Sequence, residues 1–130
     1  MKKYIVFFVT IAMLSCSNSD DEGNNTQDDL ESWNMTQRSG FGGIEDYNAG
    51  DVVWTFNNTT QMLQIENIVQ NITFDAGSYS FTMTDTTLTV EFPNETIEFV
   101  LTSQGNSRSL FYDPLPNAVD DELTFTFEVD

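Results

Sequence analysis

From Leu30 to the C-terminus, apolar side chains occupy alternate positions in short runs, and Asn, Asp, Gly, Ser and Pro separate the runs. This spacing is typical of β-strands with one buried face and one wet face. It predicts eight strands, at Glu31 to Arg38, Asp51 to Asn57, Met62 to Asn67, Ser78 to Thr84, Thr87 to Phe92, Thr96 to Thr102, Ser109 to Asp113 and Glu122 to Val129. The nearest candidate for a helix is Thr60 to Val69, but its β-branched residues favour an extended strand at least equally.

The tight turns between these strands favour pairing of neighbours along the chain. Thr84-Asp85-Thr86 and Pro93-Asn94-Glu95 are short enough to join antiparallel strands directly. A sheet with one apolar face must bury that face and protect its edges. We therefore expect an all-β fold, an antiparallel up-and-down eight-stranded barrel, with a two-layer β-sandwich as the alternative.

The N-terminal segment has the pattern of an export signal followed by an anchor. Lys2 and Lys3 precede an apolar run from Tyr4 to Leu14, which has the length of a signal-peptide core and is too short to span a bilayer. Met13-Leu14-Ser15-Cys16 resembles the bacterial lipoprotein box, in which the chain is cut before the cysteine and that cysteine is lipidated. The resemblance implies a signal peptide at residues 1–15 and a membrane anchor through the lipid on Cys16.

Residues 16–29 are polar and acidic, as in a disordered tether that cannot bury enough apolar surface to become ordered. Asp20-Asp21-Glu22 resembles the export signal that sends lipoproteins of the Bacteroidetes group across the outer membrane; alternatively, these charges only keep the tether extended. We expect an outer-membrane lipoprotein of the cell envelope, facing either the periplasm or the cell surface. A single β-barrel domain then occupies residues 30–130.

The charge and the missing residue types exclude several functions. The chain has 4 basic and 21 acidic residues, and loss of Lys2 and Lys3 with the signal peptide changes its net charge from −17 to about −19. Such a field repels nucleic acid, which is bound by neutralising its phosphates. Without histidine, and without lysine or a free thiol in the mature chain, most covalent catalysis and any zinc site are excluded. We expect no enzymatic activity, no catalytic residues and no cofactor.

Several motifs of the domain together resemble the small lipocalin-like lipoproteins of Bacteroidetes. They are Trp33 in a first strand, the glycine-rich Gly40-Phe41-Gly42-Gly43, Val53-Trp54-Thr55-Phe56, Gly77-Ser78-Tyr79, and Leu123-Thr124-Phe125-Thr126-Phe127. The resemblance implies an eight-stranded barrel with an apolar interior that holds a small hydrophobic molecule. Lipocalins proper have a glycine where this chain has Glu31, and they carry a basic residue across the tryptophan near the end of the barrel. The last strand lacks that residue, and Arg108, before the seventh expected strand, is a weak substitute.

Inward-facing aromatic residues are the candidates for lining a ligand pocket. They are Trp54, Phe56, Tyr79, Phe81, Phe99 and Phe125. A barrel of eight strands is just wide enough to be filled by its own side chains or to hold one small ligand. Because the domain is small and rich in large aromatics, plain core packing is the competing explanation for these residues.

Acidic residues suggest further sites, each with a simpler explanation. Asp75-Ala76-Gly77 after Phe74 resembles the catalytic loop of aspartic proteases, but we expect a turn there. Two clusters, Glu45-Asp46 with Asp51 and Asp120-Asp121-Glu122, have oxygen ligands for calcium without the spacing of a calcium loop, so we expect no metal site. No pair of carboxylates stands out as a glycosidase site.

Two functions are compatible with the expected anchor, the expected barrel and the acidic composition. The first is binding of a small hydrophobic ligand inside the barrel of a lipid-anchored protein. The alternative is a structural or interaction module that contacts an envelope protein or glycan through the loops at Ser39 to Gly50 or Asp113 to Asp121. The sequence identifies neither the ligand nor a protein partner.

Overall fold

The structure is a computed structural model, and it describes residues 29–40, 42–70, 72–114 and 122–130. The predicted signal peptide, Cys16 and most of the tether lie outside the described residues. Across the described part of the chain there are nine strands: β1 (Leu30–Gly40), β2 (Gly43–Asp46), β3 (Val52–Asn57), β4 (Met62–Asn67), β5 (Gly77–Met83), β6 (Thr87–Glu91), β7 (Thr96–Gln104), β8 (Ser107–Tyr112) and β9 (Leu123–Val129). Their bounds confirm the eight predicted strands to within a few residues.

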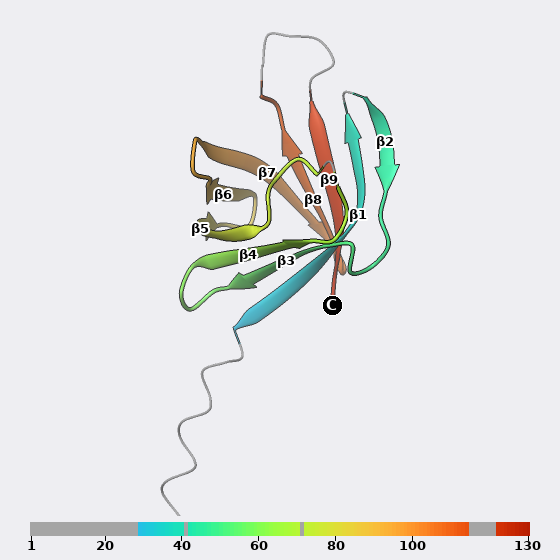
Figure 1. The fold of residues 1–130 in the computed structure, drawn as a ribbon. Coiled ribbons are helices and arrows are strands. Elements are labelled where there is room, and N and C mark those ends of the chain that lie inside the picture. The colour runs from blue at the N-terminus through green and yellow to red at the C-terminus, as the bar shows by residue number, and fades with distance from the viewer. Residues whose placement is uncertain (1–28, 41, 71, 115–121) are drawn as a thin grey trace, which may run out of the picture.

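The sheet closes on itself because β1 pairs with the last strand. β3 to β9 are antiparallel neighbours in chain order, and β1 joins β3 on one side and β9 on the other. The result is a closed antiparallel barrel with one extra strand, consistent with a lipocalin-like barrel and not with a two-layer sandwich (Figure 1).

The extra strand, β2, is not among the eight that the alternating pattern predicts. It pairs with the last four residues of β1, beside the wall of the barrel, and all four of its residues are exposed (Figure 1). A register shift between Met35 and Gln37 marks a β-bulge, and β1 pairs with β3 before it and with β2 after it. Residues 60–69, the one helix candidate, instead contain the turn after β3 and the strand β4.

The alternating apolar residues point into the barrel, as the pattern predicts. The largest fully buried side chains are Trp33, Trp54, Phe56, Phe99, Phe125 and Phe127. The rings pack edge to face or tilted, for example Phe56 on Phe81 with centroids 5.0 Å apart. None of the described polar or charged residues is buried. The middle of the barrel is therefore filled by the protein's own side chains.

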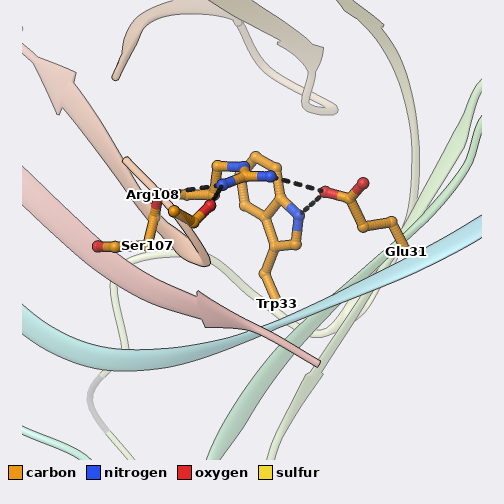
Figure 2. A network of polar contacts seen from close by, with 5 residues as sticks. Glu31, Trp33, Ser107 and Arg108 are labelled. Atoms are coloured by element: carbon orange, nitrogen blue, oxygen red, sulfur yellow. Dashed lines mark hydrogen bonds and ion pairs between the residues drawn. The ribbon is translucent and has the colours of Figure 1, made fainter. Parts of the chain in front are cut away.

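Trp33 closes one end of the barrel together with two charged residues. Its Nε1 donates a hydrogen bond to Oε1 of Glu31, and the guanidinium carbon of Arg108 lies 5.8 Å from its ring centroid (Figure 2). Arg108 also donates hydrogen bonds to the carbonyls of Gly105 and Ser107, at 2.9 and 3.1 Å. The expectation that Arg108 is only a weak substitute is therefore wrong. From β8, its guanidinium lies over the ring of Trp33.

Glu31 adds to this closure in place of the glycine of the lipocalin pattern. Its Oε1 lies 4.0 Å from Nη2 of Arg108, and both side chains are partly exposed, so the ion pair itself contributes little. Its larger effect is to accept the indole hydrogen bond, since an indole N–H shielded from water needs a partner. We call this end of the molecule the base.

We predict that Arg108→Ala lowers the free energy of unfolding by about 1–2 kcal/mol, because the cation–π contact and charged hydrogen bonds are lost. Arg108→Lys should recover less than half of this, since an ammonium group lacks the planar face and the fork of donors. Glu31→Gln is the matched control, because it keeps the acceptor for Trp33. Urea unfolding followed by tryptophan fluorescence measures all three. A stability of Arg108→Ala equal to that of the parent would contradict the role of Arg108 at the base.

Candidate functional site

The end of the barrel opposite the base is the mouth. Because β1 and β3 to β9 alternate in direction, the last residues of β1, β4, β6 and β8 and the first residues of β3, β5, β7 and β9 lie there, while the turns β3–β4, β5–β6 and β7–β8 lie at the base. A cavity lies at this end among the described residues, so the mouth is where a ligand can approach the interior.

Phe74 enters the mouth from the segment between β4 and β5. Its side chain is only 8% exposed although it belongs to no strand. The ring contacts Trp54, Phe99 and Phe125 from three different strands, with centroids 5.8, 5.8 and 5.4 Å away. Figure 1 shows the segment, in yellow-green, crossing β8 and β9 in this view, and the contact of Phe74 with Phe125 places it against β9. Phe74 thus forms the upper layer of the aromatic core.

Three side chains from three strands hold this segment in place. Arg38 on β1 donates to Oγ1 of Thr73 at 3.1 Å, and Asn67 on β4 donates to the carbonyl of Phe74 at 2.8 Å. The hydroxyl of Tyr79 on β5 donates to the carbonyl of Asp75, also at 2.8 Å. Three consecutive residues are therefore fixed around the ring that enters the core.

A cavity of about 380 Å³ lies above Phe74 at the mouth. Among the described residues its lining comprises Thr73, Phe74, Asp75, Tyr79, Phe92, Pro93, Asn94, Glu95, Ile97, Tyr112, Pro114 and Leu123. We call this space the mouth cavity. Its inner side is aromatic. Phe74 stacks on Phe92 with ring centroids 4.8 Å apart and an interplanar angle of 10°, and the ring of Tyr79 is tilted against Phe92 with centroids also 4.8 Å apart.

The electrostatics of the mouth cavity are negative. Burial raises the pKa of the Tyr79 hydroxyl above its ordinary value, and the carboxylate of Asp75 adds to the rise. Burial likewise raises the pKa of Tyr112, with further contributions from Glu95 and Asp113. Both tyrosines are neutral at physiological pH, so the charge at the mouth comes from the carboxylates.

Comparison with protein-family models, with curated proteins and with solved structures gives no match.

The structure brings together the aromatic residues that the sequence singled out, mostly deep inside the barrel. Trp54, Phe56, Phe81, Phe99 and Phe125 are each at most 2% exposed. Tyr79 is 9% exposed and is the one of the six candidates that lines the mouth cavity. The other eleven described lining residues are not among the sequence candidates; they include Phe74, Phe92, Tyr112 and Glu95. Phe92 and Tyr112 lie on the inward face near the ends of predicted strands, which was the available signal for them. Phe74 lies outside any alternating run.

The acidic motifs of the sequence have structural partners where they are described. Glu45 pairs with Arg38 at 3.3 Å and accepts a hydrogen bond from Tyr47, while Asp46 accepts one from Gln37. Asp51 accepts a hydrogen bond from the backbone of Asn48. Asp120 and Asp121 lie outside the described residues. Within the described chain, no group of three or more Asp, Glu, His or Cys side chains is placed to hold a metal ion.

A second hollow, of about 260 Å³, is lined largely by hydroxyl-bearing residues of β5 and β6 and of the turn before β4. Its described lining comprises Thr60, Gln61, Ser80, Phe81, Thr82, Thr89, Glu91 and Thr96. It has no aromatic face comparable to that of the mouth cavity.

No helix in the described part of the chain is long and apolar enough to cross a membrane.

We predict that Phe74→Ala lowers the free energy of unfolding by about 3 kcal/mol, because it removes a buried ring that bridges several strands. The mouth cavity should also deepen toward Trp54 and Phe99, which lose the ring that covers them. Phe111→Ala is the matched control, since Phe111 is only partly buried and its neighbours on β8, Leu110 and Tyr112, face the interior. Urea unfolding measures both changes. An equal loss in the two variants would show that Phe74 is not part of the core.

Proposed function

We propose that this protein is a lipid-anchored, non-enzymatic β-barrel of the outer membrane that binds a small hydrophobic ligand at the mouth of its barrel. The observation that carries the proposal is the cavity of about 380 Å³ with an aromatic floor at the mouth of the barrel. That volume falls in the lower part of the range of small-molecule pockets, roughly 300–1,000 Å³. The filled middle of the barrel limits the ligand to a small molecule.

The position of β1 supports the combination of an anchor with a binding site. Leu30 begins β1 at the base, so the predicted tether from Cys16 attaches at the end of the barrel opposite the mouth cavity. The tether reaches at most about 45 Å when fully extended. A lipid on Cys16 would then hold the base toward the membrane and leave the mouth accessible.

We predict that the neutral apolar dye N-phenyl-1-naphthylamine binds the purified domain with increased fluorescence, because the mouth cavity removes it from water. Leu123→Trp adds a ring to the lining of the cavity and should abolish this binding. Val100→Trp is the matched control, since Val100 is 53% exposed and does not line the cavity. No fluorescence increase with the parent domain, or equal binding in both variants, would refute binding at the mouth.

We predict that Cys16→Ser abolishes the lipid anchor, giving an uncleaved or soluble product, and leaves the barrel folded, because the described barrel forms its contacts from residue 29 onward. Membrane fractionation of cells and far-ultraviolet circular dichroism of the purified protein measure the two properties. If the variant is exported normally but loses its β-sheet spectrum, the separation between anchor and barrel is wrong.

A further inference from the structure

The mouth cavity combines aromatic faces with carboxylates, which restricts the charge of its ligand. Phe74, Tyr79, Phe92 and Tyr112 lie around one space, and their rings belong to two strands, β5 and β8, and to the two connections β4–β5 and β6–β7. Aromatic faces carry partial negative charge and attract cations placed over them within about 6 Å. Phe74 and Phe92 cover one face of each other by stacking, so a cation in the cavity meets the remaining surfaces of the four rings.

Asp75 and Glu95 stand in the same lining. Among the described residues, no hydrogen bond or ion pair involves the carboxylate of either side chain. Asp113 follows Tyr112 directly, and its charge acts on that tyrosine together with Glu95. A cleft with charges of one sign and weakly polarisable walls concentrates ions of the opposite sign.

The described part of the chain supplies no basic side chain to this lining. Arg38 is near the mouth, but it is held by Thr73 and by Glu45. Arg108 lies over Trp33 at the base. The positive charge that complements Asp75 and Glu95 must then come from solution or from a ligand.

We infer that the mouth cavity selects a small organic cation, an ammonium group bearing an apolar body, over neutral and anionic molecules of the same shape. The inference rests on the proposed function, because it names the class of ligand for the same cavity. An anionic amphiphile such as a fatty acid would bring its carboxylate against Asp75 and Glu95. A bare metal ion would leave the aromatic faces unused, and an ammonium ion with an apolar body satisfies both parts of the lining.

The test compares three probes that share a benzene ring and a compact tetrahedral substituent: phenyltrimethylammonium, tert-butylbenzene and benzenesulfonate. Titrations of the isotope-labelled domain followed by NMR give the affinity of each probe and place it through the amide signals of Phe92, Glu95 and Tyr112. We expect phenyltrimethylammonium to bind roughly tenfold more tightly than tert-butylbenzene at low salt, and benzenesulfonate to bind more weakly still. Added salt should reduce the preference for the cation.

Variants separate the carboxylates of the lining from the overall charge of the protein. Asp75→Asn and Glu95→Gln should each reduce the affinity for phenyltrimethylammonium about threefold or more, and leave that for tert-butylbenzene unchanged. Glu98→Gln is the matched control, because Glu98 is exposed on β7, does not line the cavity, and its substitution changes the net charge by the same amount. Its affinity for each probe should equal that of the parent.

The outcomes distinguish this inference from the proposed function. Equal affinities for the three probes, or a preference for benzenesulfonate, would overturn the cation preference and leave a hydrophobic binding site. An effect of Glu98→Gln as large as that of Glu95→Gln would also overturn it, because the preference would then arise from the whole surface. Absence of binding by all three probes would overturn both proposals.

Discussion

Closure of the barrel through β1 is the constraint on which the rest of the structure depends. β1 is hydrogen-bonded to β9, β3 and β2, so both edges of the sheet meet on this strand. Closing eight strands fixes the interior width at about the space that side chains can fill. The aromatic residues fill that space, and Trp33 of β1 completes it at the base. In the described part of the barrel, the cavity with an aromatic floor therefore lies where the strands end, at the mouth.

The strands could be predicted from the sequence because alternation is a local pattern that a buried face imposes on each strand. β2 escaped prediction because none of its residues is buried and Ile44 is its one large apolar side chain. Phe74 was not predicted to be buried, because it lies in a connection, where no alternating pattern of apolar residues indicates which side chains face the interior. The contact of Arg108 with Trp33 joins two distant parts of the chain, and it becomes visible only when β8 and β1 are placed in one closed wall.

The scarcity of basic residues gives each arginine a distinct structural role. Arg38 ties β1 to β2 through Glu45 and to the Phe74 segment through Thr73. Arg108 covers Trp33 at the other end of the same barrel. With these two cations engaged, the carboxylates of the described surface stay largely uncompensated, as at the mouth cavity. Repulsion among charges of one sign keeps a protein soluble but destabilises its folded state. Packing of the aromatic core must therefore offset this repulsion.

Phe74 determines how far a ligand can enter. Its ring occupies the upper interior, and three hydrogen bonds from β1, β4 and β5 hold the residues that carry it. A ligand that displaced the ring would bind only to the conformation in which Phe74 has left the core. Because that conformation is rarely populated, the apparent affinity of such a ligand would be reduced. A ligand that rests on the ring encounters a preformed aromatic surface and incurs no such cost. A small molecule bound above Phe74 therefore suits this barrel better than a long chain threaded into its interior.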